Sequence, residues 1–149
     1  MNIEEIPITQ IIPQRKPFLM VDKVISCGST DTITQFQVRE DLIFLEDNKL
    51  SPPGILENMA QSAAARMGSL DLISGVPVKI GYIGDIRDVT FYRLPKCNEV
   101  LETQVHIVER LLNLMLAQVS VRIADELIAS ARIKLVKTDI EAKLDNVEF

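Results

Sequence analysis

Few side chains in this sequence can do acid–base, nucleophilic or metal chemistry. His106 is the only histidine, and it lies in a run predicted to be a strand, where a surface or sheet-pairing role is favoured over catalysis. Cys27 and Cys97 lie far apart and match no metal-ligand spacing, so neither a metal nor a cofactor is expected. Glu57 stands in an apolar stretch, where burial would let its carboxyl group hold a proton. Its spacing also fits a simpler role, as the third residue of a helix, favoured there by capping and the helix dipole.

The stretch around Glu57 predicts the one long helix of the chain, over residues 55–72. Residues 51–54 (SPPG) form a helix-entry signal, and no proline interrupts the residues that follow. Leu, Met and Ala occupy so much of the helix girth that it must be buried on several sides. Gln61 lies one turn beyond Glu57 on the same face. It is expected to orient Glu57 or to bond a loop carbonyl, and a structural role is favoured.

The rest of the chain is dominated by apolar and alternating runs that predict strands. Two precede the helix and four long ones follow it, at residues 18–25, 32–38, 79–92, 100–109, 112–123 and 127–136. Turns are predicted at 27–29, 94–98, 110–111 and 124–126, with a polar loop at 46–49 and a short helix or turn near 9–12. One helix and one antiparallel sheet predict an α+β fold in which the sheet wraps around the helix.

Length and composition limit the organisation and the function. With 149 residues, of which 47% are hydrophobic, the chain (1–149) fits a single domain with its core at about 8–136. The acidic tail, residues 138–149, is expected to be a loose end or a short amphipathic helix. A net charge of −5 argues against a nucleic-acid binder. The apolar runs are too short to span a membrane and no leader pattern precedes them, so a reducing cytoplasm is the expected location.

Three motifs, in the right order, resemble bacterial 3-hydroxyacyl-[acyl-carrier-protein] dehydratases of the hot-dog fold. Residues 12–24 read IPQRKPFLMVDKV, against a family motif LPHRxPFLxVDxV in which only the histidine, here Gln14, is clearly replaced. Asp22 recurs in this motif and is interpreted as structural. Residues 53–61 (PGILENMAQ) resemble the start of the family's central helix, and residues 86–93 (IRDVTFYR) resemble the strand that follows it. The match spans nearly the whole predicted domain and implies a hot-dog fold.

The resemblance also implies a chemistry. Protomers of the family pair through their sheets, and the acyl chain lies in a tunnel at the dimer interface. A histidine from one subunit and a Glu or Asp from the partner's helix remove water across C2 and C3, while backbone N–H groups near the helix start hold the thioester carbonyl. On this resemblance Glu57 is the helix acid that protonates the leaving hydroxyl, and Gly54 and Ile55 lie beside the thioester. Tyr82 and Asp85 are candidates to line the tunnel, or they are ordinary sheet residues.

The sequence departs from the family at two points. The loop before the helix, residues 45–51, is shorter and has no histidine where the family has Gly-His-Phe-Pro-Gly. Aligned from Glu57, the family's oxyanion donors fall on Pro52 and Pro53, which have no backbone N–H. Asn48, a water or a partner residue is left to replace the histidine.

Dehydratase-like proteins of aryl-polyene and flexirubin-type pigment clusters match better. They also carry a shortened loop, and their helix resembles residues 54–68 (GILENMAQSAAARMG). The resemblance implies that such proteins work beside a second hot-dog subunit, which would supply the missing histidine across the interface. Because long sheet edges need covering, an oligomer is expected, either of identical chains or a heterodimer with that second subunit.

The function implied by the resemblance is dehydration of a 3-hydroxyacyl thioester, carried by acyl-carrier protein or coenzyme A, in fatty-acid or polyene biosynthesis. Two alternatives stay open. One is a non-catalytic or half-site hot-dog subunit that binds the acyl carrier, and the missing histidine favours it. The other is an acyl thioesterase in which Glu57 or Asn48 activates water. Carrier proteins are acidic, so the docking patch must be local. Its candidates, which are otherwise scattered surface charges, are Arg15, Lys16, Arg87 and Arg93.

Overall fold

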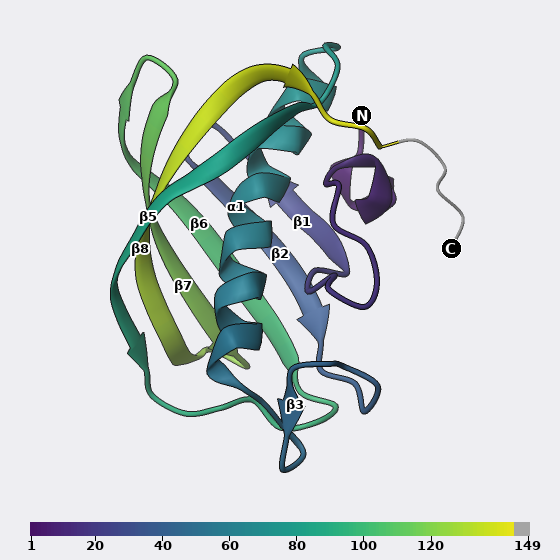
Figure 1. Cartoon of the computed structure of the whole chain (residues 1–149), viewed down its shortest axis with the longest axis vertical. Coiled ribbons are helices and arrows are strands. Elements are labelled where there is room, and N and C mark those ends of the chain that lie inside the picture. Colours follow the sequence, from purple (N-terminus) through teal and green to yellow (C-terminus); the bar gives the residue numbers. More distant parts are fainter. Residues whose placement is uncertain (145–149) are drawn as a thin grey trace.

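The computed structural model describes residues 1–144 and has one helix, α1 (Pro52–Ile73), inside a curled six-stranded antiparallel sheet (Figure 1). The strand order is β1-β2-β6-β7-β8-β5. These strands are β1 (Lys23–Cys27), β2 (Asp31–Gln37), β5 (Lys79–Phe91), β6 (Val100–Leu111), β7 (Leu114–Ile123) and β8 (Glu126–Glu141). The chain begins with two 3-10 turns, η1 (Ile3–Glu5) and η2 (Ile8–Gln10), and a small hairpin, β3 (Leu45–Glu46) and β4 (Lys49–Leu50), precedes α1. The predicted α+β layout is confirmed.

Alternating side chains place one face of the sheet against α1. Along β6, Leu101 and Val105 are buried while their neighbours in sequence are exposed, and β7 shows the same alternation. The inner residues of the sheet join Ile55, Met59 and Ala63 of α1 in one hydrophobic cluster. Because the sheet curls around the helix, α1 is buried over most of its girth, as its composition predicts.

The helix begins at Pro52, earlier than predicted. Proline is tolerated at the first helical positions because their N–H groups have no partner within the helix. Ser51 is the N-cap residue, although its side chain makes no capping hydrogen bond. Glu57 therefore stands in the second turn, and its interpretation as a capping third residue is wrong. Within residues 1–144 no helix, α1 included, is both long and apolar enough to cross a membrane.

Two predicted boundaries near loops are also wrong. The strand predicted at 18–25 begins only at Lys23, because the N–H of Phe18 donates to the carbonyl of Arg15 (2.9 Å) and closes a turn there. The turn predicted at 110–111 falls instead after Leu111, where Leu112 has a φ of 54°. Both errors arise where an apolar run continues beyond the strand itself, so hydrophobicity alone does not mark the boundary.

Two segments predicted as irregular are more regular than expected. The polar loop at 46–49 is the β3–β4 hairpin, in which Asp47 and Asn48 have φ values of 49° and 62°. This left-handed backbone is typical of a tight two-residue hairpin turn. The loose end or short helix predicted from residue 138 is wrong for residues 138–141, which continue β8. The last five residues, 145–149, lie outside the described residues.

The sheet has two edges, and residues 1–144 cover only one of them. At one edge β1 is short, and η1 and the residues after it pack over it in a second hydrophobic cluster. This N-terminal segment crosses α1 at Gly68, where an added Cβ would overlap the carbonyl oxygen of Ile11. At the other edge lies β5, a 13-residue strand that pairs only with β8 and exposes Tyr82, Ile83 and Val89. A long apolar edge of this kind is a surface for pairing with another chain.

Candidate functional site

One flank of α1 is held by buried polar side chains; we call it the anchored flank. Asn58 donates from Nδ2 to the carbonyl of Met20 (2.7 Å) and accepts at Oδ1 from the hydroxyl of Thr103 on β6 (2.6 Å). One turn further, the hydroxyls of Ser62 and Thr34 on β2 lie 2.7 Å apart. Because every one of these polar groups is paired, their burial fixes the position of the helix at little cost.

Arg66 completes the anchored flank at the turn between β1 and β2. Its Nη1 donates to the carbonyl of Gly28 and to the hydroxyl of Thr32, both at 2.9 Å, and its Nη2 donates to the carbonyl of Ser29 at 2.8 Å. The residue is 1% exposed, and this burial lowers the pKa of the guanidinium from its ordinary value. Its three bonds tie the turn to the middle of α1.

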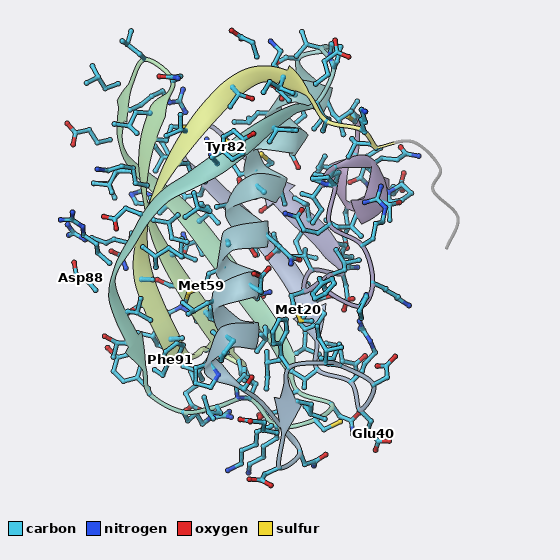
Figure 2. The ribbon with its side chains drawn as sticks, viewed as in Figure 1. Met20, Glu40, Met59, Tyr82, Asp88 and Phe91 are labelled. Atoms are coloured by element: carbon cyan, nitrogen blue, oxygen red, sulfur yellow. The ribbon has the colours of Figure 1, made fainter. Side chains whose placement is uncertain are left out.

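Gln61 joins the anchored flank to Glu57. The N–H of Met20 donates to Gln61 Oε1 (2.6 Å), and Gln61 Nε2 donates to the carbonyl of Phe18 (2.8 Å) and to Oε2 of Glu57 (2.9 Å). A backbone N–H can only donate, so Oε1 must face Met20 and Nε2 must face Glu57. Figure 2 shows Met20 beside α1, on the side away from β5. Gln61 therefore does both things predicted for it, because it orients Glu57 and bonds a loop carbonyl.

The other flank of α1 lies toward the free edge strand. From Glu57 to Ala64 the described residues make no such bonds across to the sheet, and we call this stretch the open flank; further along, Asp71 accepts from the N–H of Lys79 on β5 (3.0 Å). Glu57, Ala60 and Ala64 lie along it, each partly exposed, at the spacing of one helical face. Beside them β5 runs in the opposite direction to the helix, with Phe91 near the first turns and Tyr82 near the last ones (Figure 2). Glu57 thus lies at the N-terminal end of a strip of small apolar residues, Ala60 and Ala64, which we call the lane. Its Oε2 accepts from Gln61, and no described residue donates to Oε1.

The start of α1 offers one backbone donor. Pro52 and Pro53 occupy the first two helical positions and have no N–H to give. The N–H of Ile55 already donates to the carbonyl of Ser51 (3.1 Å). Among the described residues, no acceptor takes the N–H of Gly54, a buried residue packed against Leu50 and Phe44. Two residues, Gly54 and Ile55, are predicted to lie beside a thioester. Of their backbone N–H groups, that of Gly54 is the one without an acceptor among the described residues.

Asn48, Tyr82 and Asp85 lie apart from the Glu57–Gln61 pair. Asn48 is at the exposed tip of the β3–β4 hairpin, where its carbonyl accepts from the N–H of Cys97 (3.0 Å). Tyr82 is 54% exposed on the free edge of β5. Asp85 is bonded to Arg87 of the same strand. Of the predicted site residues, the structure thus brings together Glu57, Gln61 and those at the start of α1. Asn48 is a residue of the hairpin turn, with a φ of 62°.

The single histidine lies on the outer face of the sheet. The residues on either side of it, Val105 and Ile107, are buried against the helix, so His106 points away from it. There its Nδ1 lies 2.9 Å from Oδ1 of Asp31. Hydrogen bonds from Thr30, Gln104 and His106 together lower the pKa of Asp31 to about 2. His106 therefore belongs to a surface cluster, as predicted, and the sheet separates it from Glu57.

The predicted basic patch is mostly engaged within the chain. Arg15 bonds backbone carbonyls, including that of Ile12 (2.7 Å), and Arg87 pairs with Asp85. Arg93 pairs with Glu99 (2.8 Å), and these bonds raise its pKa above the ordinary value. The arrangement favours scattered charges over one docking patch. Within residues 1–144, no three His, Cys, Asp or Glu side chains are placed to hold a metal ion.

Sequence reasoning missed the anchored flank. Asn58, Ser62 and Arg66 are spaced four residues apart, which places them on one face of a helix. A polar stripe on a helix that must be buried on several sides indicates hydrogen bonds to neighbouring backbone and side chains. That signal was present in the sequence beside the apolar pattern.

A single helix inside a curled antiparallel sheet is the hot-dog fold, and solved structures share it. A chain of the dehydratase heterocomplex ApeI:P from Xenorhabdus doucetiae superposes with a TM-score of 0.81 at 16% identity, covering 90% of this chain and 92% of that one. A hypothetical thioesterase with coenzyme A from Streptococcus pneumoniae TIGR4 superposes with a TM-score of 0.65 at 10% identity, covering 80% and 88%. At these identities the likeness defines the fold class.

Sequence similarity identifies the family within that class. The model of the ApeP-like family, described as ApeP dehydratase, matches residues 6–146, and the chain belongs to this family. It is similar to the 3-hydroxyacyl-[acyl-carrier-protein] dehydratase FabZ of Oceanobacillus iheyensis, with 31% identity over 114 residues (72% of this chain, 78% of that protein). It is also similar to FabZ of Clostridium novyi, with 33% identity over 108 residues (68% and 74%). The predicted resemblance is confirmed.

Proposed function

We propose that this chain dehydrates 3-hydroxyacyl thioesters together with a second, different hot-dog subunit, and that Glu57 is its catalytic acid. The observation that carries the proposal is the position of Glu57. It lies at the open flank, oriented by Gln61, at the head of an apolar lane. Family membership supports the reaction class, since the FabZ relatives are 3-hydroxyacyl-[acyl-carrier-protein] dehydratases.

In this reaction a base takes a proton from C2, the C2–C3 double bond forms, and the C3 hydroxyl leaves as water after receiving a proton. Glu57 Oε1 would deliver that proton, because Oε2 is occupied by Gln61. Glu57 ends ionised and the base ends protonated, and exchange with water resets both. The N–H of Gly54 would support the thioester oxygen as negative charge develops on it.

The second subunit is needed to supply the base that takes the proton from C2. His106, the one histidine, lies on the outer face of the sheet, away from α1. A second copy of the chain would present the same faces, so a symmetric dimer brings no imidazole to Glu57. A different hot-dog subunit, paired along β5, would bring one. The solved ApeI:P structure is a dehydratase heterocomplex, which supports this assembly.

One alternative has an observation in its favour. Pro52 and Pro53 remove two of the backbone donors at the start of α1. A subunit that only binds the acyl carrier, and does not take part in the reaction, would tolerate that loss. On this alternative Glu57 is dispensable.

The test is hydration and dehydration of enoyl and 3-hydroxyacyl thioesters, on carrier protein and on coenzyme A. The chain is assayed alone and mixed with a hot-dog subunit that carries a histidine, as wild type, Glu57→Gln and the control Glu46→Gln. Glu46 is exposed on the β3–β4 hairpin. We expect turnover in the mixture that falls at least about 100-fold in Glu57→Gln and is unchanged in the control. Equal turnover for wild type and Glu57→Gln would instead establish the non-catalytic subunit.

A further inference from the structure

The lane of small residues on the open flank ends in a narrow, partly enclosed space. Beyond Ala64, a cavity of about 30 Å³ lies between α1, the start of β5 and the N-terminal segment. Its walls are formed by Ile11, Pro13, Gln14, Ala64, Met67, Val78, Lys79, Ile80 and Gly81. The space is small, so the lane narrows here.

A second, larger cavity lies on the other side of Met67. It measures about 170 Å³ and is formed between the last turns of α1, the β6–β7 hairpin and β8. Apart from Met67, its lining consists of Leu70, Arg110, Leu112, Asn113, Met115 and Lys137. Met67 therefore lines both spaces, with its side chain 3% exposed.

The side chain of Met67 closes the passage because residue 81 is a glycine. A Cβ added at Gly81 would overlap the terminal methyl of Met67, so that methyl lies directly against the backbone of β5. Methionine has three rotatable bonds and fills irregular spaces, which suits it to this position.

We propose that Met67 sets the length of the acyl chain that the protein accepts; this inference rests on the proposed function. An acyl chain whose C3 lies beside Glu57 follows Ala60 and Ala64 and stops at Met67. From residue 57 to residue 67 the helix rises about 15 Å. Carbon–carbon bonds of about 1.5 Å, laid in a zigzag, place roughly a dozen carbons in that length.

The experiment compares full-length wild type with Met67→Ala, Met67→Val and the matched control Met115→Ala. Met115 is also buried and lines only the larger cavity, so its truncation removes the same atoms without joining the two spaces. Binding of saturated acyl-coenzyme A thioesters from about four to about twenty carbons is measured by calorimetry. Turnover of the matching 3-hydroxyacyl series is measured alongside, and in both measurements the histidine-carrying hot-dog subunit of the previous assay is present. Thermal unfolding followed by circular dichroism shows which variants are folded. If Met67→Ala does not fold, Met67→Val takes its place in the comparison.

We expect wild type and Met115→Ala to lose affinity beyond roughly fourteen carbons, because C1 and C2 precede the roughly one dozen carbons that begin at C3. Truncation of Met67 should move that limit upward by roughly three carbons or more, since three side-chain atoms leave and the larger cavity opens. An unchanged limit in both Met67 variants, or an equal shift in Met115→Ala, would overturn the inference while leaving dehydration by Glu57 intact. If wild type neither binds nor turns over a thioester of any chain length, both proposals are overturned. That result is obtained with wild type, without any variant, so it is distinguishable from a failure of the inference about Met67.

Discussion

The anchored flank and the open flank of α1 are built differently. Asn58, Ser62 and Arg66 attach the anchored flank to two strands, β2 and β6, to the β1–β2 turn and to the segment before β1, through hydrogen bonds of 2.6–2.9 Å. The open flank carries the small residues Ala60 and Ala64, and among the described residues these make no side-chain hydrogen bond; the nearest tie to β5 is at Asp71, beyond them. The first arrangement fixes where the helix lies, whereas the second leaves room beside it. Glu57 lies between the two and takes its orientation from the first.

The largest effect on stability is expected when the anchored flank loses Asn58. Asn58→Ala leaves the carbonyl of Met20 and the hydroxyl of Thr103 buried without partners. We expect the free energy of unfolding to fall by about 3 kcal/mol, measured by urea titration. Ala60→Ser on the open flank is the control and should stay within about 0.5 kcal/mol of wild type. Equal losses in the two variants would remove the distinction between the flanks.

Gln61→Met should lower the free energy of unfolding less than Asn58→Ala does, and it should also lower the activity. It removes the bonds to Met20, Phe18 and Glu57 while keeping the length of the side chain. We expect a loss of about 2 kcal/mol in the free energy of unfolding and faster hydrogen exchange at the amide of Met20. Turnover should fall as well, since Glu57 loses its orienting partner. Unchanged exchange at Met20 would contradict the role assigned to Gln61.

A charge on the free edge should weaken association and leave the fold intact. Ile83→Lys places an ammonium group on β5 at a residue that is 39% exposed. We expect binding to the second subunit to weaken at least tenfold, about 1.4 kcal/mol, with an unchanged melting temperature for the isolated chain. Titration calorimetry measures the affinity. Ile43→Lys, which alters an isoleucine that is 48% exposed and lies away from β5, should have no effect on association.

The smallest effect concerns the turn that Arg66 holds. The pKa of Asp31 is lowered from 3.8 to about 2, so folding favours its ionised form. That contribution to stability is present above about pH 4 and is lost as the pH falls from about 4 to about 2. Because Asp31 is 40% exposed, we expect Asp31→Asn to cost less than about 1 kcal/mol at pH 7. The difference from wild type should vanish near pH 2, and a difference that persists there would point to a cause other than charge.

The fold was predictable because periodicity decides it. The long apolar run of α1 and the alternation in β6 and β7 specify a buried helix and a sheet with one inner face. The boundaries were not predictable from the same signal. Phe18 and Leu112 continue apolar runs, yet each lies in a turn that backbone geometry sets.

The candidate site was predictable in part. The motif around Glu57 and Gln61 marks both residues, and their hydrogen bond follows from helical spacing. The partners of Gln61 were not predictable, because Phe18 and Met20 reach it only through the path of the N-terminal segment. The closure at Met67 was hidden for a similar reason, since it depends on which residue of β5 passes beside it.

Gly68 and Gly81 both lie where the chain passes close to another segment, and they constrain sequence drift differently. At position 68 the obstacle to a larger residue is the backbone oxygen of Ile11, which cannot turn aside. At position 81 the obstacle is the end of a flexible methionine side chain. Across homologues we therefore expect position 68 to admit only glycine, whereas positions 81 and 67 should change together. A lineage could in that way alter the chains it accepts by paired substitutions, without rebuilding its fold.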